Sequence, residues 1–467
     1  MRLAIDIGGT FTDLVLEHGN ELLTKKVLTS ISQPELAVIE GVSELLEENN
    51  IKASDIKMII HGTTLATNAV IERKGAKTCF ITTSGFRDVL DIGYESRFDQ
   101  YDILIDKTMS LVPRKHRYVI DERTDVNGSI ITSIDKDQFY NLINKIKNEN
   151  FESIAVGFLH SYANPENEKI LKAFLTNELP DVEVSVSSDV CPEIREYERF
   201  TTTVVNAYIK PLMSNYLKKL DQKLLNSGFN CPLLLMTSGG TLTNISSACN
   251  NPVRLVESGP AGGAILATSI AEDMNLSKVI SFDMGGTTAK ITIIENKKAI
   301  KAREFEVDRK ARFKKGSGYP LRIPVIEMVE IGAGGGSIAR VNKLEQIITG
   351  PDSAGSFPGP ACYSNGGSMP TITDADLVIG KINPDNFAGG KIKLSKQLAD
   401  IAITENIVKF VNIDTNIAAL AISEIVDETM SNAARVHTVE QGHETSNRTL
   451  IAFGGAAPLH IARVAEK

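Results

Sequence analysis

The chain has 467 residues, more than a single hydrophobic core usually serves, so two or more domains are expected. Its hydrophobic content of 42% is typical of a globular protein, and its net charge of -8 disfavours a nucleic-acid-binding surface. Its five cysteines are widely spaced without a Cys-x-x-Cys pair, as in proteins with reduced thiols. The sequence has no run of about 18 apolar residues, the length that a membrane-spanning helix needs. We therefore expect a cytoplasmic protein without membrane or nucleic-acid partners.

The first part of the chain alternates predicted strands and helices. Helices with apolar residues at helical spacing are expected from Pro34 to about Glu48 and from Leu65 to Glu72. Strands are expected at 3–7, 13–17, 21–27, 58–60 and 78–82. This succession predicts an α/β lobe with a mixed sheet.

Between about Asp91 and Ser133 the periodicity fades while apolar residues still recur, which predicts an inserted surface subdomain near 91–133. The elements expected after it are a helix at 135–149, a strand at 153–158, a helix at 166–177 and a strand at 182–186. Together these elements define a predicted N-terminal lobe at 1–196.

The remaining residues, 197–467, are predicted to form a second lobe. A long helix at 200–227 leads into a strand at 233–236, which we interpret as the first strand of a second α/β unit. Further helices are expected at 260–272, 394–410 and 415–438, with a Gly/Pro-rich, substrate-side region at 316–390. The chain ends on a strand at 450–453 and the start of a helix, so we expect a C-terminally shortened form of a longer chain.

The most informative motif occurs twice. Asp6-Ile-Gly-Gly-Thr-Phe-Thr-Asp13 follows the first strand, and Asp283-Met-Gly-Gly-Thr-Thr-Ala-Lys290 follows a later apolar strand. Each copy ends a strand on a carboxylate and then makes a glycine turn whose backbone can approach a phosphate, next to hydroxyls that can bind phosphate oxygens. A single copy is equally compatible with a simple hairpin, but the duplication favours two lobes that hold one nucleotide.

Two other glycine segments are candidates for ligand contact. Gly332-Ala-Gly-Gly-Gly-Ser337 lacks the dinucleotide-binding spacing, yet its backbone amides can approach a phosphate or substrate; a packed turn is the alternative. Gly454-Gly-Ala-Ala457 follows a strand, and its flat backbone suits an adenine-ribose face. A Walker A sequence is absent, which excludes P-loop phosphate binding.

Polar groups also gather at the end of the strand at 58–60. His61-Gly-Thr-Thr-Leu-Ala-Thr-Asn68 enters a helix there, at the sheet edge where α/β proteins tend to present ligands. A lone histidine at such a place is more often structural than catalytic. Glu257-Ser-Gly-Pro-Ala-Gly-Gly263 places Ser258 at a helix start, which favours either anion binding or an ordinary cap.

With these motifs the chain resembles the hydantoinase A and 5-oxoprolinase family, which is also similar to the ATP-binding subunits of acetone and acetophenone carboxylases. The resemblance runs along nearly the whole chain and also rests on Gly85-Phe-Arg-Asp-Val-Leu, Arg195-Glu-Tyr-Glu-Arg, Pro358-Gly-Pro-Ala-Cys-Tyr and Thr373-Asp-Ala-Asp-Leu. It implies an α/β, actin-like ATPase fold of the sugar kinase and heat-shock chaperone type, with ATP in a cleft between duplicated lobes.

The resemblance implies ATP and Mg²⁺ as cofactors, with Asp6 and Asp283 holding Mg²⁺ directly or through water. The catalytic residues would be Asp6, Asp283 and Thr287. The residues expected to contact the nucleotide are Gly8, Gly9, Thr10, Thr12, Gly285, Gly286, Thr288, Lys290, Gly334, Gly335, Gly454, Gly455 and Ala456. Those expected on the substrate side are His61, Thr63, Thr64, Asn68 and Ser258.

The implied function is that of an ATP-dependent cyclic amidohydrolase subunit, which phosphorylates the carbonyl or amide oxygen of a small cyclic amide so that water opens the ring. The alternatives are a ketone carboxylase subunit and, in another class, a chaperone-like reactivating ATPase. A B-type hydantoinase subunit is the implied partner, in a homo- or hetero-oligomer. Many family members carry Asp-Ile-His-Thr where this chain has Glu327-Met-Val-Glu330, which leaves the choice among hydantoins, 5-oxoproline, other lactams and ketones open.

Overall fold

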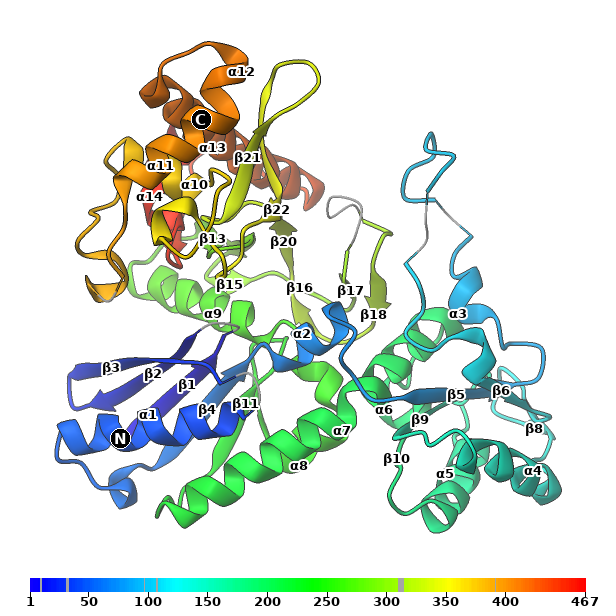
Figure 1. The fold of residues 1–467 in the computed structure, drawn as a ribbon. Helices are drawn as coiled ribbons and strands as arrows, with labels where there is room; N and C mark the ends of the chain where they lie inside the picture. The colour runs from blue at the N-terminus through cyan, green and yellow to red at the C-terminus, as the bar shows by residue number, and fades with distance from the viewer. Residues whose placement is uncertain (9–10, 31–32, 96, 106–107, 310–314, 391) are drawn as a thin grey trace. The chain divides into compact units, whose positions relative to one another are not determined.

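The structure, a computed structural model, describes residues 1–8, 11–30, 33–95, 97–105, 108–309, 315–390 and 392–467. The chain forms two compact units, each built from two separate stretches (Figure 1). Unit 1 comprises Met1–Gly262 and Lys301–Val325, and unit 2 comprises Gly263–Ile300 and Ile326–Lys467. No described helix is long and apolar enough to cross a membrane.

A six-stranded mixed sheet forms the first layer of unit 1. Its strands, in the order β12-β11-β4-β1-β2-β3, are Leu242–Asn244, Leu233–Met236, Met58–Thr63, Arg2–Ile7, Phe11–His18 and Glu21–Leu28. The strand β1 pairs antiparallel with β2 and parallel with β4, which confirms the predicted mixed sheet. Helices α1 (Pro34–Glu48) and α2 (Leu65–Ile71) lie within a few residues of the predicted bounds.

The strand β11 (Leu233–Met236) corrects one prediction, because it does not begin a second α/β unit. It pairs parallel with β4 in the first sheet, with Leu235 opposite His61. The compact units accordingly separate at Gly262 and not at 196/197. An apolar strand after a long helix can return to the earlier sheet or start a new one, and its sequence pattern is the same in both cases.

The second sheet of unit 1 is parallel and has the order β10-β9-β5-β6. Its strands are Glu183–Val186, Ser153–Gly157, Thr78–Thr83 and Arg117–Ile120. Because β6 comes from the region 91–133, part of the predicted insertion belongs to this sheet.

The helices α4 (Lys136–Lys147) and α5 (Glu166–Glu178) lie close to the predicted ranges. The remaining elements of unit 1 are α3 Val89–Ile92, β7 Arg123–Thr124, β8 Ile130–Thr132, α6 Ser187–Val190, α8 Ile245–Asn250, β16 Lys301–Ala302, β17 Phe305–Val307 and β18 Tyr319–Leu321.

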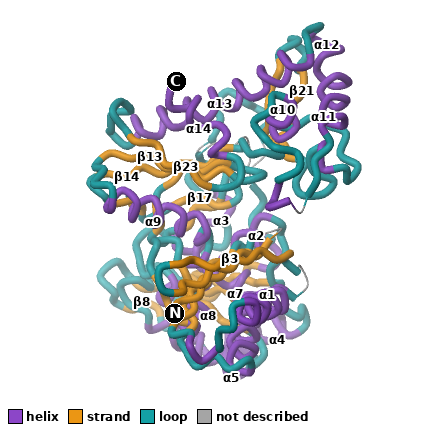
Figure 2. Tube along the Cα trace, turned by 90° about the vertical axis from the view of Figure 1, so that its left-hand side faces the viewer, coloured by secondary structure: helices purple, strands orange, loops and turns teal. Residues whose placement is uncertain are grey.

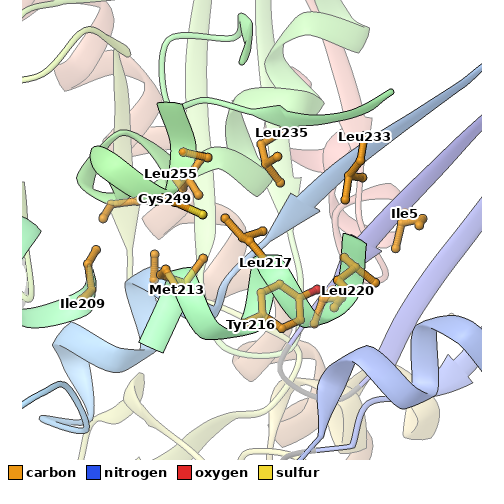
Figure 3. Close-up of a cluster of buried hydrophobic side chains, with 14 of the residues drawn as sticks. Ile5, Ile209, Met213, Tyr216, Leu217, Leu220, Leu233, Leu235, Cys249 and Leu255 are labelled. Carbon is orange, nitrogen blue, oxygen red and sulfur yellow. The ribbon is translucent and has the colours of Figure 1, made fainter. Parts of the chain in front are cut away.

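The long helix α7 (Glu196–Asn226) connects the two sheets of unit 1 through its contacts with β9, β10, α1 and α2. Its buried side chains include Met213, Tyr216 and Leu217, which pack with Leu235 and Ile5 of the first sheet (Figure 3). Burial of an aliphatic side chain of this size contributes about 1.5–3 kcal/mol. The helix therefore provides much of the core of unit 1.

Unit 2 repeats the strand pairing of unit 1. Its main sheet has the order β15-β14-β13-β23, with β20 also paired to β14. The strand β13 (Lys278–Met284) is antiparallel to β14 (Ala289–Glu295) and parallel to β23 (Thr449–Phe453), as β1 is to β2 and β4. The other strands are β15 Lys298–Ala299, β20 Met328–Ile331, β21 Ser337–Val341 and β22 Ile347–Ser353, while β19 Val325–Ile326 spans the junction. The duplicated motif thus lies on a duplicated arrangement of strands.

Helices cover both faces of the unit 2 sheet (Figure 2). On one face α9 (Ser258–Asp273) packs through Ala267 and Ala271 against Val279. On the other, α13 (Thr415–Glu440) and α14 (Ala457–Glu466) pack against alternate residues such as Phe282. The remaining helices are α10 Ile372–Val378, α11 Lys396–Ile403 and α12 Lys409–Val411, with a π-helical segment at Thr404–Val408.

The core role of α7 predicts unequal effects of two leucine truncations on that helix. Leu217 is 0% exposed and Leu225 is 56% exposed. We expect Leu217→Ala to lower the free energy of unfolding by about 2–5 kcal/mol, because it removes buried methyl groups and leaves a cavity. Leu225→Ala is the matched control and should change that free energy by less than about 1 kcal/mol. Urea unfolding of both variants measures the difference, and equal effects would contradict the packing described above.

Candidate functional site

Glycine segments that are far apart in the sequence meet at one end of the unit 2 sheet. The turn of the second Asp-Gly-Gly-Thr motif joins β13 to β14, and its carbonyl groups accept hydrogen bonds from the loop at 332–337. Gly335 N–H donates to Gly285 O at 3.0 Å, and Gly336 N–H donates to Gly286 O at 2.7 Å. The two backbones therefore lie in direct contact.

The Gly454 segment reaches the same place. Ala456 N–H donates to Met284 O at 2.9 Å, directly before the Gly285 turn. Gly454 has φ +86°, and a Cβ there would lie 2.6 Å from Met284 O and 2.8 Å from Asp283 Oδ1. Only glycine fits a position that is both left-handed and this crowded.

The loop at 332–337 is a packed turn, which was the alternative to phosphate contact in the sequence analysis. Besides the two bonds to the turn, Gly334 N–H donates to Ser337 Oγ at 2.9 Å. A Cβ on Gly334 would lie 2.5 Å from backbone atoms of Thr287. The amides of Gly334 and Gly335, which the sequence assigns to phosphate contact, thus already have acceptors within unit 2. In contrast, Gly286 and Thr287 at the tip of the supported turn are exposed to solvent.

A row of charged side chains lies next to this turn. Lys290 on β14 is directly opposite Asp283 on β13 and Glu330 on β20, so the three side chains share one face of the sheet. Lys290 Nζ lies 3.4 Å from Glu330 Oε1. Burial raises the pKa of the half-buried Asp283 carboxyl, and the charge of Lys290 opposes that rise. The sequence pattern does not predict Glu330 as the partner of Lys290, because the two residues are on strands far apart in the chain.

The Asp283 carboxylate meets the requirements of a magnesium ligand. A partly desolvated carboxylate gains from a nearby cation, and Mg²⁺ binds through one or two carboxylates plus phosphate oxygens and water. Among the described residues there is no group of three or more His, Cys, Asp or Glu side chains that could hold a metal alone. A single carboxylate of this kind is compatible with an ion whose other ligands are phosphate oxygens and water.

In unit 1 the first motif lies beside two other predicted motifs. A Cβ on Gly62 would be 3.1 Å from Asp6 Oδ1, and a Cβ on Gly259 would be 4.0 Å from the same oxygen. Thr64 N–H and Thr64 Oγ1 both donate to Ile7 O, at 3.1 and 3.2 Å. The structure thus brings Asp6, Thr64 and the Gly259 segment together. Gly9 and Thr10 lie outside the described residues.

The other hydroxyls of this region connect backbone segments. Ser258 Oγ donates to Thr63 O at 3.3 Å, and Thr63 Oγ1 accepts from Leu65 N–H at 3.1 Å. Asn68 Nδ2 donates to Thr64 Oγ1 at 3.3 Å. These bonds position the start of α2 against the segment around Gly259, and Ser258 joins the start of α9 to the end of β4.

His61 lies in the core of unit 1, away from any surface that a substrate could reach. It is 0% exposed, with Nδ1 3.3 Å from Ile5 O and Nε2 2.8 Å from Tyr216 Oη. Because a carbonyl can only accept, Nδ1 carries the proton and Nε2 accepts from the tyrosine hydroxyl. Burial lowers the pKa of His61 to about 4. The side chains at alternate positions of β4 point to opposite faces, and His61 is on the inner one.

Thr12 is also a buried structural residue. Its hydroxyl lies 3.0 Å from Thr29 Oγ1, which in turn donates to Gly8 O at 3.0 Å. Thr12 is 0% exposed, so its hydroxyl supports the first glycine turn from behind. No sequence signal points to Thr29, because this threonine directly follows β3 and belongs to no motif.

The Thr373 hydroxyl and the Asp374 carboxylate, both in the motif at 373–377, support the glycine loop. The sequence does not predict this role. Thr373 donates to Gly335 O through both its N–H (2.7 Å) and its hydroxyl (2.8 Å). Buried Asp374 accepts from Cys362 N–H at 2.7 Å and from Thr371 N–H at 2.9 Å. The start of α10 thus joins the Pro358 segment to the glycine loop.

The crowding at Gly454 predicts different effects for two neighbouring substitutions. Gly454→Ala places a Cβ on a left-handed residue and against a carbonyl oxygen, so the free energy of unfolding should fall by about 2–5 kcal/mol. Gly455→Ala is the matched control, because a Cβ at Gly455 meets nothing within 4 Å. Thermal and urea unfolding measure both, and equal stabilities would show that the contact with Met284 does not form.

The burial of His61 predicts a pH dependence of stability. Because the folded-state pKa of about 4 lies below the ordinary 6.5, the unfolded chain binds this proton more readily. The contribution of His61 is fully present above pH 6.5 and is lost as the pH falls towards 4. His61→Gln lacks this titration. The free energy of unfolding of the wild type minus that of His61→Gln should therefore fall by roughly 2 kcal/mol between pH 7 and pH 5. His18→Gln, at an exposed position, is the control, and a constant gap for His61→Gln would contradict a buried neutral imidazole.

Known proteins resemble this chain along its whole length. Caprolactamase subunit alpha of Pseudomonas jessenii is 33% identical over 473 residues, which cover 100% of this chain and 67% of that protein. The solved structure of this ATP-dependent caprolactamase matches with a TM-score of 0.86 over 100% of this chain and 67% of that chain. The acetophenone carboxylase gamma subunit of Aromatoleum aromaticum is 30% identical, covering 98% of this chain and 64% of its own length.

A nucleotide-free structure of acetone carboxylase, from work on ATP-dependent acetone carboxylation, is 25% identical and matches with a TM-score of 0.83 over 100% of this chain and 66% of that chain. This chain therefore spans about two thirds of these relatives. The α/β fold with mixed sheets is consistent with the actin-like ATPase type that the resemblance implied. The model of the hydantoinase/oxoprolinase N-terminal region matches residues 2–179, and that of hydantoinase/oxoprolinase matches residues 199–467. The chain belongs to the hydantoinase/oxoprolinase family.

Proposed function

We propose that this chain is the ATP-binding subunit of an enzyme that phosphorylates the carbonyl or amide oxygen of a small cyclic amide, so that water can open the ring. The observation that carries the proposal is the exposed Gly286–Thr287 turn beside the desolvated Asp283 carboxyl in unit 2. Backbone glycines support this turn from behind and leave its tip open. A turn of this kind allows phosphate oxygens to approach the backbone closely.

The proposed nucleotide contacts are residues of the two Asp-Gly-Gly-Thr motifs and of the Gly454 segment. Gly285, Gly286, Thr287 and Thr288 of unit 2 would bind phosphate oxygens, and Lys290 would balance their charge. In unit 1 the corresponding residues are Gly8, Gly9 and Thr10. The Gly454–Ala456 backbone would lie against the adenine-ribose part of ATP, as its glycine-rich, side-chain-poor surface allows.

Asp6 and Asp283 are the proposed magnesium ligands, directly or through water. When bound, Mg²⁺ neutralises charge on the phosphate oxygens. The carboxylate of Asp283 is held beside the turn by its place at the end of β13, and Lys290 lies directly across from it. Thr287, at the exposed tip, would orient the transferred group.

In the proposed reaction the substrate oxygen forms a bond to the γ-phosphorus while the bond from that phosphorus to the bridging oxygen of ADP breaks. The chain contributes mainly positioning and charge compensation, which account for most of the catalysis of phosphoryl transfer. On the substrate side we propose Thr64 and the Gly259 segment, which lie beside Asp6. His61 and Thr12 act as scaffold residues, because both are buried.

The similarity to caprolactamase supports a cyclic amide, and the similarity to acetophenone and acetone carboxylases supports a ketone equally. A ketone carboxylase subunit is therefore the second candidate. Two of these relatives are named as subunits, which supports a second, B-type subunit as the partner of this chain. A chaperone-like ATPase of the same fold would hydrolyse ATP without a small substrate.

The test is ATP hydrolysis with Mg²⁺ by the chain alone and together with its copurifying partner. Hydantoin, 5-oxoproline, caprolactam, and acetone or acetophenone with bicarbonate are the substrates to compare. We expect one class to raise the rate of ADP formation at least about tenfold. Rates that are the same with every substrate would refute substrate phosphorylation and favour the chaperone-like function.

The role of Asp283 provides a second test. Asp283→Asn keeps the shape but removes the charge, so substrate-stimulated turnover should fall at least about 100-fold. Because burial disfavours the charged form of Asp283, the variant should unfold at the same or a higher urea concentration than the wild type. Asp273→Asn, at an exposed position of α9, is the matched control. Unchanged turnover in Asp283→Asn would refute the proposed magnesium ligand.

A further inference from the structure

Unit 2 contains a buried ionic cluster that the proposed nucleotide contacts do not include. His460 on α14 lies between two aspartates, with Nε2 3.0 Å from Asp376 Oδ2 and Nδ1 2.8 Å from Asp427 Oδ1. Asp376 is on α10 and Asp427 is on α13. His460 is 0% exposed, and both aspartates are 1% exposed. The cluster therefore joins three helices in the interior of unit 2.

Two carboxylates face the ring of His460 and favour its charged form. Nδ1 forms a hydrogen bond with Asp427 Oδ1, whereas Nε2 contacts Asp376 Oδ2 as an ion pair without hydrogen-bond geometry. The two aspartates raise the pKa of His460 to about 9 although burial acts in the opposite direction. Lys381, in the loop after α10, also faces the cluster: its Nζ lies 2.8 Å from Ser423 Oγ and 3.7 Å from Asp376 Oδ1. The cluster thus holds two positive and two negative groups, and Lys381 Nζ also lies 3.5 Å from His460 Nδ1.

The cluster lies one helical turn from two of the glycine segments. The helix α14 begins at Ala457, directly after the Gly454 segment, and His460 is in its first turn. The helix α10 contains Thr373, which donates twice to Gly335 O, and Asp376 is three residues further on. A displacement of either helix start would therefore move the glycine segment attached to it.

We propose that His460 is a positioning residue: its ion pairs with Asp376 and Asp427 fix the starts of α14 and α10, and so hold the Gly454 segment and the Gly334–Gly336 loop against the Gly285–Gly286 turn. The consequence for ATP affinity rests on the function proposed above. The consequence for the glycine segments does not, because it follows from the hydrogen bonds within unit 2.

Packing alone does not explain why these positions are ionic. The same three helices already share an apolar cluster, including Ile372, Ile422, Val426 and Val464. Burying a salt bridge carries a desolvation cost that often offsets the attraction, so a buried ion pair is a weak stabiliser compared with apolar side chains of similar volume. Ion pairs do, however, impose a specific geometry on the groups they join, since the charges are compensated in one arrangement only.

The test is residue-resolved hydrogen exchange of the full chain at pH 7. In His460→Gln we expect the amides of Gly335, Gly336 and Ala456 to exchange at least tenfold faster than in the wild type, with smaller changes in β13 and β14. His443→Gln is the matched control, because His443 is a partly exposed histidine of the same unit that pairs with Glu295. Unchanged exchange at the three amides in folded His460→Gln would overturn the proposal. If that variant does not fold, Asp427→Asn, which retains His460 and Asp376, provides the same measurement with the same criterion.

A second measurement separates positioning from the proposed function. The dissociation constant of a non-hydrolysable ATP analogue with Mg²⁺ should rise at least fivefold in His460→Gln at pH 7. In the wild type it should rise as the pH passes about 9, where His460 loses its proton, and this rise should be absent from His460→Gln. If the wild type does not bind the analogue, the proposed function fails and the exchange result alone decides the positioning role. If binding weakens while the three amides keep their protection, the positioning role fails.

Discussion

The structure of unit 2 depends on direct contact between backbone segments that have no side chains to separate them. The amides of Gly335 and Gly336 donate to the carbonyl oxygens of Gly285 and Gly286, and the Gly454 segment closes on Met284 from another side. A Cβ at Gly334 or Gly454 would lie within 2.6 Å of a backbone atom. This contact leaves Gly286 and Thr287, at the tip of the turn, exposed to solvent.

Charged side chains have different surroundings on the two sides of the unit 2 sheet. On the face covered by α9, Asp283 is partly desolvated and lies in a row with Lys290 and Glu330. A carboxyl in this state gains when a cation binds, so its unfavourable environment suits ligand binding. On the face covered by α13 and α14, the charges around His460 compensate one another within the protein. The first arrangement contains the proposed magnesium ligand, and the second contains the proposed positioning residue.

Several polar residues in the motifs hold the scaffold together. His61 donates to and accepts from groups in the core of unit 1, while Thr12 supports Gly8 through Thr29. Ser258 and Thr63 connect the start of α2 to the Gly259 segment. Substitutions at these positions should therefore affect stability before they affect chemistry, and a loss of activity there would need a stability measurement to interpret.

The sequence by itself determined the local elements, the duplicated Asp-Gly-Gly-Thr motif and the family, because hydrophobic periodicity and motif spacing are properties of short segments. The helix at Pro34–Glu48 and the strand at Leu233–Met236 have the predicted bounds. Only the tertiary structure decided that β11 joins the first sheet, that His61 points inward, and that Thr29, Thr373 and Glu330 contact the motif residues. These are contacts between residues far apart in the chain. A polar residue at a strand end has the same sequence pattern whether it faces a ligand or the core, and the packing of distant helices and strands makes the choice.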